Sequence, residues 1–195
     1  MRCFIRLNRL LLTGIVRLLL AGIVAAAAVL SLTQVALAGP PEPTVPGEIA
    51  VPDGNKVFLV GHAVGVQMYS CNATPSGFAW SSATPRANLY NDQGKLIITH
   101  FAGPTWQAMD GSRVVGRAEA SVIPDLTAIP WVRLVAASTA AGPDGDRLVA
   151  TTYIQRIRTT GGLTPPAAEC SAATAGTVAE VPYTADYYFW KKTDG

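Results

Sequence analysis

The sequence of 195 residues predicts an all-β fold: a single-domain antiparallel β-sandwich or closed β-barrel that follows an N-terminal signal peptide. Two observations support this prediction. Short runs of strand-forming residues alternate with turn signals throughout residues 51–192. No stretch of helical length in that region repeats its apolar residues every 3.6 positions. About eight to ten short strands joined by hairpins fit both architectures, so both stay open.

The N-terminal segment 1–38 has the three parts of a signal peptide. Arginines and no acidic residues occur in the first seventeen positions, an apolar run covers 18–32, and Ala-Leu-Ala stands at 36–38. A basic start, a short apolar core and a small-residue exit are typical of an exported precursor. The alternative is an uncleaved anchor over 10–32, which the Ala-Leu-Ala sequence disfavours. We therefore expect a secreted or periplasmic protein with no membrane span after cleavage.

The basic excess of the chain lies in this same segment. The whole sequence has 15 basic and 13 acidic residues, and residues 1–38 contain four arginines and no acid. Cleavage therefore leaves 11 basic against 13 acidic residues, a net charge of −2. A protein that binds DNA or RNA needs its basic charge on the folded domain, so we expect no nucleic-acid partner.

The remaining chain divides into a lead-in and one domain. Residues 39–50 contain four prolines and few side chains to bury, which predicts an extended lead-in. Residues 51–192 have the length of one ordinary β-rich domain. Its expected strands are 57–60, 64–71, 77–80, 87–90, 96–101, 106–109, 114–115, 131–138, 148–158 and 183–190.

Three turn sequences separate strands with particular clarity. They are Asn-Asp-Gln-Gly at 91–94, Asp-Gly-Ser at 110–112 and Gly-Pro-Asp-Gly-Asp at 142–146. Glycine supplies the positive φ that tight hairpin turns require. The turns therefore predict antiparallel pairing between the strands on either side of them.

Two cysteines remain after the signal segment, Cys71 and Cys170. In an oxidising compartment two such cysteines usually form a disulfide, which would here enclose about 100 residues. The alternative is two buried thiols.

Motifs for cofactor chemistry are missing from the sequence. It has no G-x-G-x-x-G, P-loop, G-x-S-x-G or H-E-x-x-H sequence. The two histidines, His62 and His100, have no spacing that suggests a zinc site. We therefore expect neither a metal nor a cofactor.

The densest group of unusual residues occurs at 100–112. A Gly-Pro pair breaks the strand there, so we expect His100 and Trp106 to flank a bend and approach each other. In a functional interpretation His100 is an acid or base, Asp110 orients it, and Trp106 is a flat platform for a ligand. In a structural interpretation Trp106 is core, Asp110 caps its turn, and His100 is a satisfied strand residue.

Three further residues are candidates for ligand binding. Gln67 and Tyr69 alternate with apolar residues and therefore share one face of their strand. Arg156 could bind an anion, although a solvated face or an internal ion pair is the ordinary place for such an arginine. The aromatic run 183–190 either lines a ligand surface or fills the core. The expected partner is a small molecule, a glycan or an envelope ligand.

Several motifs occur in an order that resembles a known family. They are GVQMYSC at 65–71, the run 100–112, IPW at 129–131, YIQRIRTTGG at 153–162 and VPYTADYYF at 181–189. Together they resemble the secreted bacterial and fungal proteins of domain-of-unknown-function family thirty-four fifty-five. The resemblance implies export and one β-rich domain without an established activity. Some fungal relatives carry a malate dehydrogenase label, but the dinucleotide fingerprint and βαβ pattern of such an enzyme are missing here.

These observations predict an exported β-domain that acts as a non-catalytic binding or envelope-associated module. The alternative is an extracellular, hydrolase-like enzyme that uses His100 and Asp110 beside Trp106. Whether the domain is catalytic stays open at this point.

Overall fold

The computed structural model of the protein describes residues 39–193. The predicted signal segment 1–38 lies outside the described residues. The described chain is all-β, as the sequence predicts, and every strand pair is antiparallel. Its elements are η1 (Gly47–Ile49), β1 (Asn55–Thr74), β2 (Gly77–Trp80), β3 (Thr84–Tyr90), β4 (Leu96–Phe101), β5 (Thr105–Ala108), β6 (Arg113–Val122), β7 (Trp131–Ala140), β8 (Tyr153–Gly161), η2 (Ala167–Glu169) and β9 (Val178–Lys192).

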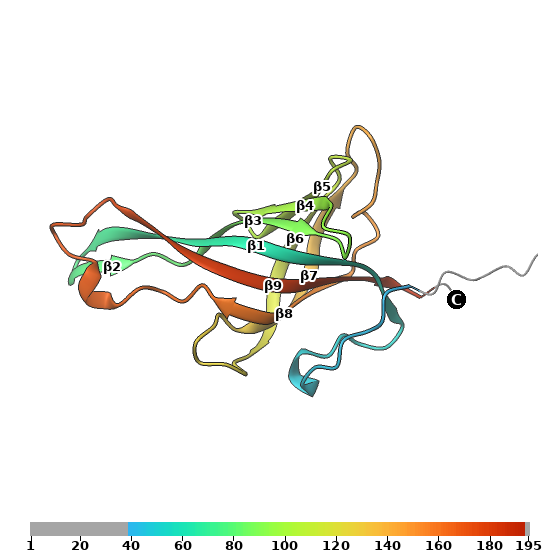
Figure 1. Cartoon of the computed structure of the whole chain (residues 1–195), viewed down its shortest axis with the longest axis horizontal. Helices are drawn as coiled ribbons and strands as arrows, with labels where there is room; N and C mark the ends of the chain where they lie inside the picture. The colour runs from blue at the N-terminus through green and yellow to red at the C-terminus, as the bar shows by residue number, and fades with distance from the viewer. Residues whose placement is uncertain (1–38, 194–195) are drawn as a thin grey trace, which may run out of the picture. The chain divides into compact units, whose positions relative to one another are not determined.

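The sheet closes on itself. Its strand order is β2-β1-β3-β4-β5-β6-β7-β8-β9, and β1 also pairs with β9 (Figure 1). Residues 62–68 of β1 pair with β3 on one side and with β9 on the other. Every strand except β2 is therefore part of a closed ring. Of the two predicted architectures, the closed barrel describes the molecule.

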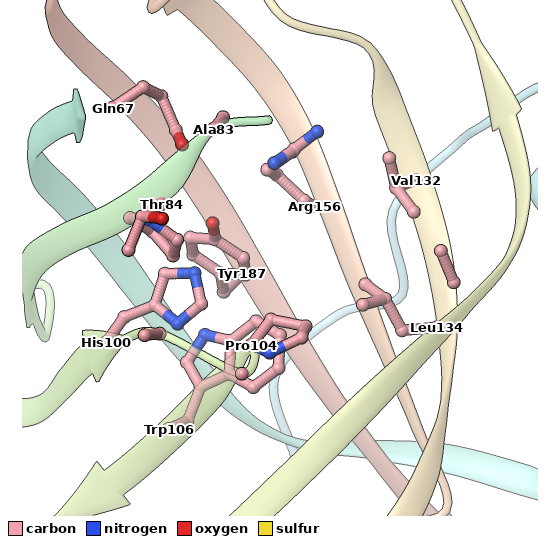
Figure 2. Close-up of a pocket in the computed structure, with 14 residues that line it drawn as sticks. Gln67, Ala83, Thr84, His100, Pro104, Trp106, Val132, Leu134, Arg156 and Tyr187 are labelled. Atoms are coloured by element: carbon pink, nitrogen blue, oxygen red, sulfur yellow. The ribbon is translucent and has the colours of Figure 1, made fainter. Parts of the chain in front are cut away.

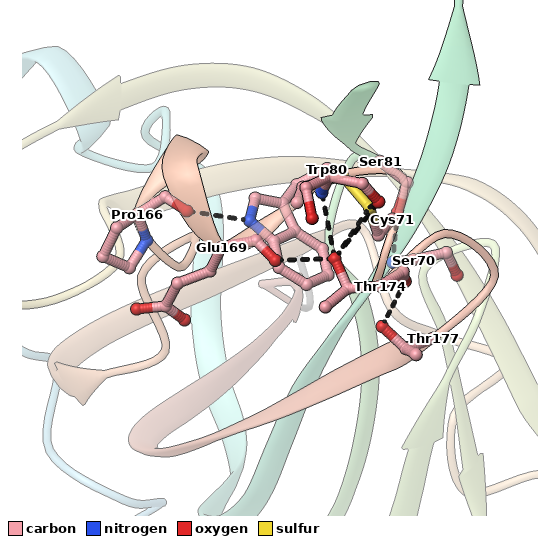
Figure 3. Close-up of a disulfide and its surroundings, with 10 residues drawn as sticks. Ser70, Cys71, Trp80, Ser81, Pro166, Glu169, Thr174 and Thr177 are labelled. Carbon is pink, nitrogen blue, oxygen red and sulfur yellow. Dashed lines mark hydrogen bonds between the residues drawn. A yellow bond between two sulfur atoms is a disulfide. The ribbon is translucent and has the colours of Figure 1, made fainter. Parts of the chain in front are cut away.

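The long strand β1 continues beyond the ring and forms a hairpin extension with β2 (Figure 1). The predicted disulfide lies at the base of this extension, where Cys71 is joined to Cys170 with a Cα–Cα distance of 5.3 Å. Trp80 packs beside it and donates its Nε1–H to the Pro166 carbonyl at 3.2 Å (Figure 3). The disulfide therefore connects the extension to the segment around η2, and the alternative of two buried thiols is wrong.

The barrel interior is filled mainly by apolar and aromatic side chains. Trp106, Leu89, Ile98 and Phe189 are each at most 1 % exposed. Gly116 makes room for the largest of them, because a Cβ there would lie 2.9 Å from Cζ3 of Trp106. Protein interiors are packed as densely as organic crystals. The indole ring of Trp106 therefore occupies the space that a side chain at position 116 would need.

A second apolar cluster lies on the outer face of β8 and β9. Tyr188 and Trp190 alternate with the interior residues of β9 and pack here, so residues 187–190 are buried on both faces of the strand. The Pro-rich lead-in covers this cluster through Ile49, which is fully buried. Gln155 fixes the lead-in by donating its Nε2–H to the Ile49 carbonyl at 2.7 Å. The proline content alone did not indicate this contact.

Candidate functional site

A pocket of about 250 Å³ opens into the barrel interior (Figure 2). The interior faces of the strands supply its deeper wall, and the turn between β4 and β5 together with the start of β3 forms its rim. The lining residues are Gln67, Ala83, Thr84, Pro85, His100, Ala102, Gly103, Pro104, Trp106, Ala118, Val132, Leu134, Arg156 and Tyr187. Four of the residues that the sequence singled out, Gln67, His100, Trp106 and Arg156, therefore meet in one place.

His100 and Trp106 form a stacked pair at the base of the pocket. They are direct partners across β4 and β5, their ring centroids are 4.2 Å apart, and their planes differ by 8°. Tyr187 meets the His100 ring edge-on at 5.3 Å. The Gly-Pro turn, in which Gly103 has a φ of 99°, returns the chain so that the pair can form. The approach expected from the bend is found.

The His100 imidazole is neutral and has a defined tautomer. Its Nδ1 lies 2.9 Å from the Thr105 carbonyl, which can only accept, so Nδ1 carries the hydrogen and Nε2 keeps a lone pair. Burial lowers the pKa of His100 to about 4. The ring is therefore an uncharged group near neutral pH, and its Nε2 can accept a hydrogen bond.

Arg156 is the only charged residue among those that line the pocket. Its Nε and Nη2 both donate to the Pro130 carbonyl, at 3.2 Å and 2.9 Å. Within residues 39–193 no carboxylate forms an ion pair with it. The pocket therefore contains a positive charge that the described protein does not neutralise.

Two buried N–H groups in the pocket wall have no hydrogen-bond partner among the described residues. They are Nε2 of Gln67 and Nε1 of Trp106, on side chains that are only 2 % and 1 % exposed as residues. Figure 2 shows the oxygen of the Gln67 amide directed into the pocket, and rotation about the last side-chain bond would exchange it with Nε2. A buried donor without a partner costs about 1–3 kcal/mol, so such groups need a reason to persist.

Two buried tyrosine hydroxyls lie 3.4 Å apart, one on the pocket residue Tyr187 and one on Tyr183. Burial raises the pKa of both phenols. The nearby charge of Arg156 opposes the rise at each of them. Both hydroxyls therefore stay protonated and neutral at physiological pH.

Asp110 does not join this group. Its Oδ1 accepts hydrogen bonds from the backbone N–H and the hydroxyl of Ser112, at 2.9 Å and 2.6 Å. Its Oδ2 accepts from the backbone N–H of Arg147 at 2.9 Å. The carboxylate thus holds its own turn against the 142–148 loop and does not line the pocket. The pairing of Asp110 with His100 is not found, because each side chain has other partners.

Tyr69 also lies outside the pocket lining. It is 3 % exposed, and its hydroxyl donates to the Gly162 carbonyl at 2.7 Å. The sequence interpretation did not name Tyr187 as a pocket residue. Strand periodicity contained the signal, because Tyr187 shares a face with Tyr183 and Phe189 in β9.

A second polar cluster lies on the outside of the barrel around His62. Its Nδ1 is 2.7 Å from Asp186 and its Nε2 is 2.8 Å from Asp92. Arg158 donates to the other oxygen of Asp186 at 3.0 Å. Hydrogen bonds from Asp186 and Asp92 raise the pKa of His62 above its ordinary value of 6.5. The His62 imidazolium is therefore favoured where the His100 imidazolium is not.

The pKa values of the two histidines will lie on opposite sides of 6.5. An NMR pH titration of their imidazole C–H signals measures both. We expect His62 above that value and His100 at about 4. Asp186→Asn will lower the pKa of His62 and leave His100 unchanged, because Asp186 bonds only the former. Superimposed titration curves with midpoints near 6.5 would contradict the environments of both His62 and His100.

The same shifts act on stability with opposite signs. His62 stabilises the fold fully below pH 6.5, and this contribution is lost as the pH rises through its raised folded pKa. His100 is neutral in the fold but protonated in the unfolded chain below pH 6.5. As the pH falls from 6.5 towards 4, His100 therefore lowers the stability by up to about 3 kcal/mol.

Within residues 39–193 no helix has the length and apolar character needed to cross a membrane. In the same part of the chain no three His, Cys, Asp or Glu side chains are grouped so that they could hold a metal.

No curated protein and no solved structure matches the chain. A family model described as "protein of unknown function (DUF3455)" matches residues 52–191, which span β1 through β9 and the whole pocket. This match agrees with the resemblance carried by the sequence motifs. The chain belongs to the DUF3455 family.

Proposed function

We propose that this protein is an exported, non-catalytic binding module whose barrel pocket holds a small molecule. One observation carries the proposal: the pocket combines a cation that no described carboxylate pairs with and buried donors that no described acceptor satisfies. The great majority of buried polar groups in proteins are hydrogen-bonded, so these unpaired donors favour a ligand that supplies the acceptors. Small-molecule sites have this composition, a mostly apolar wall with a few placed polar groups.

The size of the pocket favours a small molecule over a glycan chain. Its volume of about 250 Å³ lies just below the usual range for ligand sites. The opening is bordered by short side chains such as Ala83, Ala102 and Ala118. A compact ligand can therefore enter without rearrangement of the barrel.

A hydrolase that uses His100 has less support. The Nδ1–H of His100 donates to the Thr105 backbone carbonyl and not to a carboxylate. The residues that line the pocket include no serine, cysteine, aspartate or glutamate. In nucleophilic catalysis a histidine base activates a nearby serine, cysteine or threonine and is itself oriented by a third group, most often a carboxylate. The arrangement therefore favours binding.

Export is part of the same proposal. It rests on the signal features of residues 1–38, and the Cys71–Cys170 disulfide supports it, because disulfides persist mainly in oxidising compartments.

A native mass spectrum of the protein purified from the exported fraction of its own host tests the proposal. We expect an added mass that disappears on denaturation. Ala118→Trp, which places a large side chain at the pocket opening, should abolish the added mass. Ala73→Trp, on the exposed extension, should retain it. A wild-type protein that is always ligand-free, or an added mass that survives in Ala118→Trp, would contradict the proposal.

A further inference from the structure

We infer that the ligand is a small monocarboxylate with an apolar body, bound by its carboxylate to Arg156. This inference rests on the proposed function of the pocket and adds the chemical class of the ligand. It follows from the charge of the pocket, from the hydrogen bonds of the guanidinium and from the distribution of apolar walls.

The charge balance selects an anion. The lining residues include one arginine and no acidic side chain, and His100 and Tyr187 are both neutral near pH 7. A cationic ligand would meet the charge of Arg156 inside a largely apolar pocket. A singly charged anion neutralises it, and opposite charges attract more strongly beside a half-buried group such as Arg156 than in bulk water.

The geometry of Arg156 selects a planar anion with two oxygens. One edge of the guanidinium, Nε and Nη2, is occupied by the Pro130 carbonyl. This fixes the plane of the group. The Tyr187 hydroxyl also hydrogen-bonds the guanidinium, so a ligand at the edge formed by Nη1 and Nη2 would share that edge with the hydroxyl or displace it. Two parallel N–H groups on one edge match a carboxylate bidentately. Figure 2 shows the guanidinium beside the space that Gln67 and Tyr187 also border.

The rest of the pocket suits an apolar body. Val132 and Leu134 of β7 form one apolar wall of the pocket. Pro104 and Trp106, at the turn between β4 and β5, form another (Figure 2). Besides Arg156, the polar atoms of the lining side chains are those of Thr84 and Gln67, of the neutral rings of His100 and Tyr187, and the unpaired Nε1–H of Trp106. The pocket therefore has a polar end at Arg156 and an apolar remainder, the pattern of a carboxylate with a short hydrocarbon or aromatic group.

A matched pair of probes tests the inference on extensively dialysed protein. Benzoate and benzamide have nearly the same shape, and benzoate alone carries a charge. Dissociation constants come from ligand-observed NMR titration. We expect benzoate to bind about tenfold to a hundredfold more tightly than benzamide, which corresponds to hydrogen bonds to a charged group. Benzylamine, which carries the opposite charge, should bind more weakly than either.

Variants assign the preference to Arg156. Arg156→Gln should remove the difference between benzoate and benzamide. Arg156→Lys, which keeps the charge but loses the two-pronged edge, should retain part of it. Arg117→Gln is the matched control, because Arg117 is largely exposed and paired with Glu119 on the barrel surface. The control should behave as the wild type does.

The outcomes separate this inference from the proposed function. Equal binding of benzoate and benzamide, or tighter binding of benzylamine, overturns the carboxylate class while the pocket remains a binding site. Absence of benzoate binding together with an added mass in the native spectrum also overturns only the class. If Arg156→Gln does not fold, the wild-type comparison of the three probes still decides.

Discussion

Replacing Cys71 and Cys170 together by alanine will lower the free energy of unfolding by about 4 kcal/mol. The disulfide joins positions 99 residues apart in sequence, so its loss frees a large loop in the unfolded chain. Both cysteines are buried, and their loss also removes packing at the base of the β1–β2 extension. Urea unfolding followed by far-UV circular dichroism measures the change.

Reduction provides the control for this prediction. Wild-type protein in a thiol reductant should approach the stability of the double variant, whereas the double variant should not respond to the reductant. Before reduction, denatured protein without residues 1–38 should give no thiol to an alkylating reagent. Two reactive thiols, or a double variant as stable as the wild type, would contradict a stabilising disulfide.

Gly65→Ala will destabilise the protein by about 3 kcal/mol or more, although it adds a single methyl group. A Cβ at position 65 would lie 2.3 Å from the Arg86 carbonyl oxygen and 2.5 Å from Cα of Ala87. These are backbone atoms of β3, which cannot rotate away as a flexible side chain can. The seam between β1 and β3 would have to open, and with it the closed ring.

Gly47→Ala is the matched control for the Gly65 variant. A Cβ at position 47 has no neighbour within 4 Å, so its effect should stay within about 0.5 kcal/mol. Chemical denaturation of both variants measures the difference. Equal stabilities would show that β1 and β3 do not approach as closely as the structure has them.

Strand propensity and turn chemistry predicted most of the sheet. The turns at 91–94 and 110–112 connect antiparallel neighbours, as their glycines indicated. Closure could not be predicted, because it depends on the pairing of β1 with β9 at opposite ends of the sequence. Local patterns specify which residues form strands, but not which distant edges meet.

Strand lengths were less predictable than strand positions. The last strand was expected over 183–190, but β9 begins at Val178 and contains Pro182, although proline cannot donate to a ladder. β6 extends to Val122 through Glu119, although glutamate has a low strand propensity. Pairing with β7 decides this length, and tertiary contacts of that kind leave little trace in a local sequence.

The candidate site, like the fold, was predictable only in part. The bend after His100 predicted its approach to Trp106, because a hairpin returns the chain to the same level of the sheet. Asp110 follows four residues after Trp106, and a strand of that length advances on the order of 13 Å. β5 therefore carries Asp110 towards the opposite end of the hairpin from the Gly-Pro turn. The expected pairing of Asp110 with His100 was wrong because residues close in sequence lie far apart along an extended strand.

The indole N–H spectrum of nitrogen-labelled protein tests the central claim, that the barrel pocket binds a small molecule, most directly. The spectrum is recorded before and after addition of the small-molecule fraction released by denaturing protein from its own host. We expect the Trp106 signal to move, because its Nε1–H lies in the pocket wall without a described partner. The Trp80 signal should stay, since its Nε1–H is already bonded to Pro166 outside the barrel. An unchanged Trp106 signal, or a change confined to Trp80, would contradict a ligand in this pocket.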